Sequence, residues 1–358
     1  MRWLALPAGI ILLAATLLDV FHTLVVPRAA RGRLRLTKIL FRLFWRPVRW
    51  FGIRFRTAQA RERFLAFAAP GFFMGQLVIW AALAVVAYAL IYYSPPFSGG
   101  LQGTGGATFA NALYFSGSTL FTIGFGDVVV SGAARAVAVA EGATGLGLVA
   151  VVIAYLPVFY QAFNRREVGI LLLDARAGSP PSGPELLRRM LPGDGGEALG
   201  ALFVQWESWA ADVLETHLSY PLLAYFRSPH DNTSWVTSLG AVLDGATLVL
   251  AALDGGPQDQ ARMLYATGVH AVEDLFYYFR RPKWHSVIER AEFDEVLRDL
   301  KDRGAALRPA DEAWDRFHTL RKAYGGRLTA LAVMLAAPPS EWIGDRSTIP
   351  EPEAERRS

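Results

Sequence analysis

A run of 63 residues, from Phe64 to Gly126, contains no Asp, Glu, Lys or Arg. Charged residues make up about a quarter of soluble proteins and cover much of their surface, so a run of this length is atypical of a soluble domain. Hydrophobic residues account for 53% of the 358-residue chain, and its mean hydropathy is positive, at +0.26. These features predict an all-α membrane protein.

The apolar pattern predicts three transmembrane helices. The first covers Trp3–Val26, interrupted only by Asp19, which is long enough to cross about 30 Å of hydrocarbon. A cleaved signal peptide is the alternative, but the stretch is too long, no small-x-small cleavage site follows it and the next segment is basic. The second helix covers Pro70–Tyr93, and the third covers Ala133–Phe163 and ends at Asn164-Arg165-Arg166.

Residues 28–63 contain twelve Lys or Arg and a single acid, Glu62. This pattern predicts an amphipathic helix on the cytoplasmic leaflet, in contact with anionic lipids and not with nucleic acid. A voltage sensor is the alternative; Pro47, expected to interrupt the helix, argues against it, as does the positive-inside rule. A cytoplasmic position for this segment and for Arg165 and Arg166 places the N-terminus outside and the C-terminus in the cytoplasm. The cations expected to share one face of this helix are Arg35, Lys38, Arg42, Arg46 and Arg49. If this segment crossed the membrane as a voltage sensor, Arg28, Arg31 and Arg33 would lie outside, against the positive-inside rule.

A short apolar segment followed by glycine-rich backbone lies between the second and third spans. Residues 98–106 are predicted to form a loop, and Thr108 is placed to cap a helix over Phe109–Leu120. That helix would be about 18 Å long, too short to cross a membrane. A short helix followed by irregular backbone at membrane depth is a re-entrant loop, which is tolerated where it lines a protein-walled or water-filled path.

The segment Thr122-Ile123-Gly124-Phe125-Gly126-Asp127 follows this helix. A dehydrated cation needs closely spaced oxygens, and backbone carbonyls provide them without fixed charge. The two glycines allow the backbone to alternate between ordinary and positive φ, so that successive carbonyls face one axis. Thr122 adds a hydroxyl at the inner end, and Asp127 attracts cations at the outer mouth. The side chains of Ile123 and Phe125 are expected to point away from the axis, against the short helix.

Residues Thr119–Asp127 match the pattern Thr-x-x-Thr-x-Gly-(Tyr/Phe)-Gly-Asp at every fixed position, and the chain resembles the potassium channel superfamily over roughly residues 67–166. The resemblance implies a tetrameric potassium-channel pore fold with K⁺ as the permeant ion and no cofactor. The chain is similar to bacterial channels with two spans in each pore domain, here with an added N-terminal span. This similarity implies that the protein lies in a bacterial inner membrane. Because each chain has one filter segment, it implies a homotetramer. The carbonyl ligands would come from Thr122, Ile123, Gly124 and Phe125, with Gly126 and Asp127 completing the outer turn.

The resemblance also suggests supporting residues. Some relatives carry a Glu four residues before the filter Thr, hydrogen-bonded to the filter Asp; this position is Ser118 here, which with Thr119 and Glu141 is a candidate for filter support. Relatives often bend their inner helix at glycine to open a gate, and close helix packing is the alternative role. The candidate gating residues are Gly142, Gly145 and Gly147.

Two polar residues are predicted to meet inside the membrane. Asp19 lies about 10 Å from the inner end of the first span, and Gln76 lies about 9 Å into the second. Their equal depth predicts a hydrogen-bonded pair that docks the two helices, with proton sensing as the alternative. His22, one turn below Asp19, is placed to join them.

The sequence divides into an N-terminal transmembrane helix (1–27), a basic juxtamembrane segment (28–66), a pore domain (67–166), an all-α cytoplasmic domain (167–343) and a disordered tail (344–358). Residues 236–253 are apolar enough for a fourth span, but Asp244 and Thr247 favour a buried bundle helix. Helices of the cytoplasmic domain are predicted at Glu185–Leu191, Glu197–Leu218, Ser234–Leu253, Gln258–Tyr278, Trp284–Asp302 and Ala310–Leu335.

The region after residue 166 contains no strand followed by Gly-x-Gly-x-x-Gly and no Walker sequence, so no bound dinucleotide is expected. A metal or ligand site at His217, His230 or the pair His270/Glu273 is the alternative to ordinary interhelical hydrogen bonds. The chain has no cysteine and no nucleophile–base constellation, so it is not predicted to be an enzyme. The sequence predicts a potassium channel subunit regulated by its helical domain. The alternatives are a potassium transporter subunit, which requires four filter-like segments in one chain, and a membrane-anchored sensor or scaffold with a silent pore.

Overall fold

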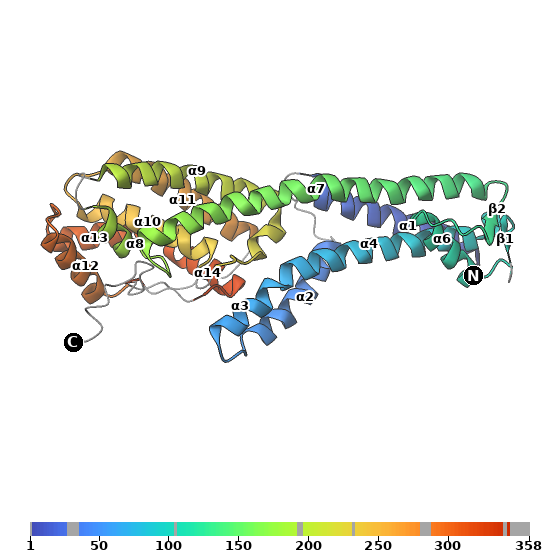
Figure 1. Cartoon of the computed structure of the whole chain (residues 1–358), viewed down its shortest axis with the longest axis horizontal. Helices are drawn as coiled ribbons and strands as arrows, with labels where there is room; N and C mark the ends of the chain where they lie inside the picture. Colours follow the sequence, from blue (N-terminus) through green and yellow to red (C-terminus); the bar gives the residue numbers. More distant parts are fainter. Residues whose placement is uncertain are drawn as a thin grey trace. The chain divides into compact units, whose positions relative to one another are not determined.

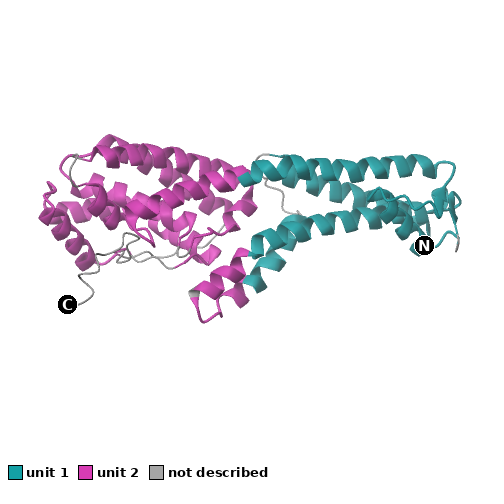
Figure 2. Cartoon of the chain, viewed as in Figure 1, with its two compact units in different colours: residues 1–48, 67–160 teal, residues 49–66, 161–358 magenta. Residues whose placement is uncertain are grey.

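The computed structural model describes residues 2–26, 36–103, 106–191, 196–230, 233–279, 288–338 and 342–343. These residues are almost entirely helical (Figure 1). The chain divides into two compact units (Figure 2). Unit 1 comprises residues 1–48 and 67–160, and unit 2 comprises residues 49–66 and 161–358. The predicted tail, 344–358, lies outside the described residues.

Unit 1 is built on two apolar helices that pack along each other. Helix α1 covers Arg2–Val20 and continues into a π-helical turn, η1 (Phe21–Val25), and α4 covers Ala68–Tyr93. The two backbones approach closely at Gly9, where a Cβ atom would lie 2.7 Å from the carbonyl oxygen of Ala87. The first two predicted spans are therefore present as helices, joined through a small residue, which is typical of membrane helix packing.

The segment between α4 and the last helix of unit 1 contains α5 (Pro95–Ser98), β1 (Leu101–Gly103), α6 (Phe109–Leu120) and β2 (Val128–Val130). Helix α6 has the predicted bounds, and the Thr108 hydroxyl caps it by accepting a hydrogen bond from the backbone N–H of Asn111, at 3.2 Å. β1 pairs antiparallel with β2, Leu101 opposite Val130. The prediction of a simple loop over 98–106 was wrong in this respect, because three-residue strands are too short to show an alternating pattern; the β-branched run Val128–Val130 was the available signal.

Helix α7 covers Ala134–Ala177 and is 44 residues long (Figure 1). The prediction that this helix ends at Asn164-Arg165-Arg166 was wrong. Charged residues end an apolar stretch, but they do not end a helix. The helix ends instead before Gly178, which has φ = +83° and can adopt the left-handed conformation that commonly follows a helix C-terminus.

The basic segment forms α2 (Leu36–Gly52) and α3 (Ala58–Ala66). Pro47 lies inside α2 and does not interrupt it, contrary to the prediction, because a helix can continue past a proline with the loss of one hydrogen bond. Within unit 1, the rings of Phe41 and Phe44 pack against Phe72 of α4, with centroids 4.9 and 5.4 Å apart. Arg42 and Arg46 are exposed, as expected for the cationic face, whereas Arg28, Arg31, Arg33 and Arg35 lie outside the described residues.

Unit 2 is a helical bundle around α10 (Trp235–Ala252). Its other helices correspond closely to the predicted ones, with two exceptions. The predicted helix Trp284–Asp302 is described as a helix only from Arg290 onward, and residues 284–287 lie outside the described residues. The predicted helix Ala310–Leu335 is two helices, separated at Lys322–Tyr324 just before the pair Gly325-Gly326. Glycine lowers helix propensity and so favours a break there. The elements are α8 (Gly183–Met190), α9 (Glu197–Ser219), η2 (Pro221–Tyr225), α11 (Gln258–Phe279), α12 (Arg290–Asp302), α13 (Ala310–Arg321) and α14 (Gly325–Leu335).

By length and composition, four of the described helices are able to cross a membrane: Arg2–Val25, Gln59–Tyr93, Ala134–Ala177 and Trp235–Ala252. In the fourth, α10, 94% of the residues are buried within the protein, whereas only 11% of the residues in the most apolar window of the third helix are buried. Asp244 of α10 accepts hydrogen bonds from Arg321, at 2.9 Å, and from the Tyr324 hydroxyl, at 2.6 Å. The burial and this polar network favour a bundle helix, the reading preferred from the sequence.

Candidate functional site

The backbone of residues 122–126 alternates in conformation. Thr122, Gly124 and Gly126 have φ values of +56°, +63° and +81°, whereas positive φ is absent at the described residues between them, Ile123 and Phe125. This is the expected alternation, except that it begins two residues earlier than the first glycine, at Thr122. Positive φ is uncommon for a β-branched residue and marks a strained position that its surroundings must hold.

The C-terminal end of α6 holds the inner part of this segment. The carbonyl oxygen of Ser118 accepts from the N–H of Ile123 at 2.8 Å, and the Ser118 hydroxyl accepts from the N–H of Gly124 at 3.1 Å. The carbonyl of Thr119 accepts from the N–H of Thr122 at 3.0 Å. The structure therefore brings Ser118 and Thr119 together with the backbone of residues 122–124, the segment predicted to be the filter.

Tyr114 of α6 is a contact that the sequence analysis missed. Its ring stacks on that of Phe125, with centroids 6.2 Å apart, and its hydroxyl donates to Asp127 at 3.2 Å. Phe125 thus packs against α6, as predicted. Asp127, for which the resemblance suggested a partner at position 118, accepts instead from Tyr114 and from the backbone N–H of Val128, the latter at 3.0 Å. An aromatic residue with a polar tip on the filter-facing side of α6 was the available signal.

Glu141 of α7 is fully buried behind α6. It accepts a hydrogen bond from the Tyr92 hydroxyl of α4 at 2.8 Å and a short one from the Ser116 hydroxyl of α6. One turn further along α7, Thr144 is hydrogen-bonded to Tyr88 of α4, at 2.8 Å. Glu141 thus joins α4, α6 and α7, and its hydrogen-bond partners are Tyr92 and Ser116, outside residues 122–126.

The three candidate gating glycines of α7 have different surroundings. A Cβ atom at Gly145 would lie 2.0 Å from the carbonyl oxygen of Leu120, the last residue of α6, whereas Gly142 and Gly147 have nothing within 4 Å of the corresponding position. Gly145 therefore permits close packing of α7 on α6. Gly142 and Gly147 leave open space, and the gating role stays a hypothesis for these two.

We expect Gly145→Ala to lower the thermal midpoint of the protein, because the methyl group would displace the end of α6 to which the filter is attached. Gly147→Ala is the matched control: alanine is more favourable than glycine in a helix by roughly 0.5–1 kcal/mol, so this variant should be at least as stable as the wild type. Both midpoints are measured by tryptophan fluorescence on heating. Equal midpoints for the two variants would contradict close packing at Gly145.

The predicted hydrogen bond between Asp19 and Gln76 is not formed. Asp19 accepts instead from the indole N–H of Trp80, at 2.9 Å, and from the Thr37 hydroxyl, at 2.5 Å. Gln76 is buried, and neither its amide oxygen nor its amide nitrogen has a partner among the described residues. His22 lies in the π-helical turn, where its ring meets that of Phe21 edge-on at 5.8 Å. The intramembrane polar contact therefore joins α1 to α4 and α2.

Of the histidines singled out in unit 2, His217 takes part in interhelical contacts, whereas His270 lies 3.7 Å from Asp274 of its own helix, and the backbone N–H of His230 donates to the Ser228 hydroxyl at 3.3 Å. His217 lies 3.2 Å from Arg166 and packs on Trp235, with ring centroids 4.8 Å apart. Burial, and to a lesser extent the charge of Arg166, lowers the pKa of His217 well below its ordinary value, so its ring is neutral. Glu273 accepts from Arg327 at 3.0 Å instead of pairing with His270. Among the residues that the structure describes, no cluster of His, Cys, Asp or Glu is arranged to hold a metal ion.

Residues 77–162 match a family described as an ion channel. The matched region begins in α4, contains α6 and the 122–127 segment, and ends in α7. These residues form an ion-channel domain. This family is one of transport proteins and not of enzymes, which agrees with the prediction that the chain is not an enzyme.

One relative of known sequence is an uncharacterized membrane protein of Bacillus subtilis, YdjJ, which is 26% identical over 244 residues, or 68% of each chain. No solved structure matches the chain. The protein is thus a mostly helical, multi-pass membrane protein that carries an ion-channel domain between its other helices.

Proposed function

We propose that the chain is one subunit of a homotetrameric, potassium-selective channel that conducts K⁺ passively. The observation that carries the proposal is the alternation of positive φ at Thr122, Gly124 and Gly126. Such alternation allows the carbonyls of residues 122–125 to face one axis and replace the water shell of K⁺. Asp127 would attract cations at the outer mouth.

The requirement for four copies is supported by what a single chain leaves uncovered. Ile123 is 54% exposed and Phe125 is 66% exposed in the isolated chain, although both are apolar. One filter segment supplies only one wall of a pore. Neighbouring copies around a fourfold axis would cover these side chains and complete the ring of carbonyls.

The orientation and the domain map remain those proposed from the sequence, with the N-terminus outside, the helical domain in the cytoplasm and the pore in residues 67–166. The exposed Arg42 and Arg46 of α2 support contact of the basic segment with anionic lipids at the cytoplasmic leaflet.

Regulation by the helical domain is supported by the course of α7. This helix belongs to unit 1 up to Tyr160 and contributes core residues to unit 2 after it, with Ile170 and Leu173 buried. Within unit 2, the buried Arg166 guanidinium donates to the carbonyls of Leu223 and Phe226, at 2.9 and 2.8 Å. A change in the packing of unit 2 would therefore act on the helix that continues into the pore domain. We place the candidate hinge at Gly142 and Gly147.

The test is flux through purified protein in liposomes. We expect K⁺ efflux to exceed Na⁺ efflux by at least about 100-fold and to be blocked by Ba²⁺, because a carbonyl filter discriminates by coordination. Equal fluxes of the two ions would contradict potassium selectivity. The absence of flux together with a monomeric mass would favour the membrane-anchored scaffold with a silent pore.

A further inference from the structure

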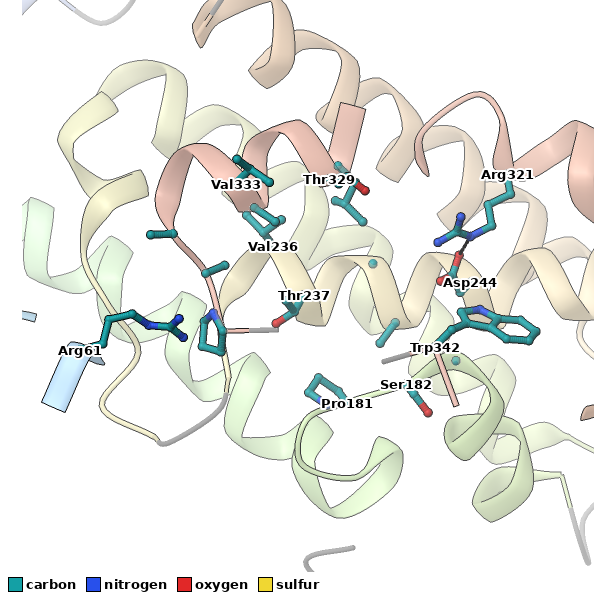
Figure 3. A pocket seen from close by; sticks show the side chains of 18 of the residues that line it. Arg61, Pro181, Ser182, Val236, Thr237, Asp244, Arg321, Thr329, Val333 and Trp342 are labelled. Atoms are coloured by element: carbon teal, nitrogen blue, oxygen red, sulfur yellow. Dashed lines mark hydrogen bonds and ion pairs between the residues drawn. The ribbon is translucent and has the colours of Figure 1, made fainter. Parts of the chain in front are cut away.

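A cavity of about 440 Å³ lies within unit 2 (Figure 3). Its walls come from the end of α2 and from α3, on one side, and from α10 and α14 of the bundle. The volume falls within the range of about 300–1,000 Å³ that is typical of small-molecule sites. The pore mechanism proposed above makes no use of it.

Three residues that line the cavity each carry an N–H group that is buried without a hydrogen-bond partner among the described residues. These groups are Nε of Arg49, Nη2 of Arg61 and Nε1 of Trp342. All three are donors. Because buried donors are nearly always hydrogen-bonded in native structures, an occupant that brings acceptor atoms would suit these residues.

The charges at the cavity are also unbalanced. Of the side chains that line it, Arg49, Arg61 and Arg321 are cations and Asp244 is a carboxylate already bonded to Arg321, at 2.9 Å. Next to the lining, Glu62 pairs with Arg61 at 3.3 Å and with Arg227 at 3.0 Å, so one carboxylate serves two guanidinium groups. The acceptor-rich occupant is therefore an anion.

Two features lower the positive potential only in part. Arg49 donates to the carbonyl of Val333 at 3.0 Å, and Arg227 donates to that of Leu335 at 2.7 Å, near the C-terminal end of α14. These carbonyls carry partial negative charge. Burial lowers the pKa of Arg227, Glu62 raises it and the nearby charge of Arg61 lowers it further, which agrees with crowded cations at this end.

Much of the remaining wall is apolar, with Val236 on α10 and Leu328 and Ala332 on α14. In Figure 3, Arg61 points into the cavity on the side of Thr237, whereas Trp342 lies at the other end, near Ser182 and Asp244. The cavity thus presents Arg61 at one end and the ion pair of Arg321 with Asp244 at the other, with apolar side chains of α10 and α14 in its wall.

We propose that this cavity binds an amphiphilic anion, with a carboxylate or phosphate head held by Arg49 and Arg61 and a short acyl chain or similar apolar body along α10 and α14. Such a ligand would connect the segment that precedes α4 in sequence to the bundle. The site deepens the proposed regulation by naming the ligand class of the helical domain, and only the effect on flux rests on the proposed function.

The test uses the full chain in nanodiscs of phosphatidylcholine, with octanoate and octyl phosphate as probes and titration of empty nanodiscs subtracted. Calorimetry should show saturable binding of one probe per chain. Octanol, which lacks the charge, and inorganic phosphate, which lacks the chain, should bind at least about tenfold more weakly, the effect of losing one charge-assisted hydrogen bond or the apolar contact. Octanol binding as tightly as octanoate, or no saturable binding, would overturn the proposal.

Variants locate the site. Arg61→Gln and Arg49→Gln should each raise the dissociation constant about tenfold or more, and Ala332→Phe should abolish binding by filling the cavity. Arg298→Gln removes the same charge from an exposed position of α12 and should leave the constant within about twofold. An equal loss in Arg298→Gln and Arg61→Gln would show non-specific attraction and refute the site.

Phosphatidylglycerol added to the nanodiscs distinguishes the source of the ligand. Competition with octanoate would identify a membrane lipid, and lack of competition a soluble anion; both are compatible with the site. Octanoate should also change K⁺ flux in liposomes, and unchanged flux with normal binding would overturn the regulatory role. If no K⁺ flux occurs under any condition, the proposed channel function fails while the binding result stands by itself.

Discussion

Gly124→Ala is expected to abolish K⁺ flux in liposomes. Gly124 has φ = +63°, and holding a residue with a side chain in the left-handed region costs roughly 1–2 kcal/mol. In a tetramer the penalty is repeated in each chain, for a total of about 4–8 kcal/mol against the conducting backbone. We therefore expect flux per tetramer to fall at least about 100-fold, since each 1.4 kcal/mol changes an equilibrium tenfold.

Gly132→Ala is the matched control for this variant. Gly132 also has positive φ, +58°, and open space around its Cβ position, but it lies between β2 and α7, outside the filter segment. Its backbone penalty is similar, so flux per tetramer should remain close to that of the wild type. Equal losses in the two variants would mean that the glycine at 124 acts on folding and not on the pore.

Glu141→Leu is expected to destabilise the pore domain. The substitution leaves the buried Tyr92 hydroxyl without its acceptor, which costs about 1–3 kcal/mol in each chain and about four times that in a tetramer. The Ser116 hydroxyl retains the carbonyl of Val85 as an acceptor, at 2.9 Å, so it adds little to the loss. We expect a thermal midpoint several degrees below that of the wild type, together with dissociation of the tetramer at lower detergent concentration.

Glu141→Gln keeps an acceptor for Tyr92 and should lie between the wild type and Glu141→Leu. Tyr92→Phe removes the other partner of this hydrogen bond. Because the two residues contact each other, the combined variant Glu141→Leu/Tyr92→Phe should lose less than the sum of its two single variants. Strictly additive midpoint changes would show that this hydrogen bond does not stabilise the fold.

The pore helix and the first two spans were predictable because the signals for them are local. The length of an apolar run, the capping hydroxyl of Thr108 and the two alternating glycines each act within a few residues. For this reason the observed bounds of α6 and the observed alternation of φ agree with those predicted from the sequence. The end of α7 was not predictable from charge, because helix continuation depends on backbone-breaking residues such as Gly178, whereas charge reports only on the solvent.

The partner of Asp19 shows why other contacts were missed. Depth along a helix axis placed Asp19 level with Gln76, but residues 76 and 80 lie one turn apart on the same face of α4, and a difference of one turn is within the uncertainty of that arithmetic. Trp80 supplies a donor with a longer reach, and it forms the hydrogen bond. Side-chain reach and helix rotation are set by packing, which is not visible in one dimension.

The amino-acid sequence by itself determined the apolar helices α1 and α4, the short helix α6, the alternation of Gly124 and Gly126 with their neighbours and the helical nature of most of the other described residues. Only the tertiary structure decided that Tyr114 bonds Asp127, that Glu141 joins three helices, and that Arg49 and Arg61 face a cavity instead of lipid. The physical reason is the range of the interactions. Hydropathy and backbone preference act on neighbouring residues, whereas hydrogen bonds and charge balance depend on side chains that folding brings together from distant segments.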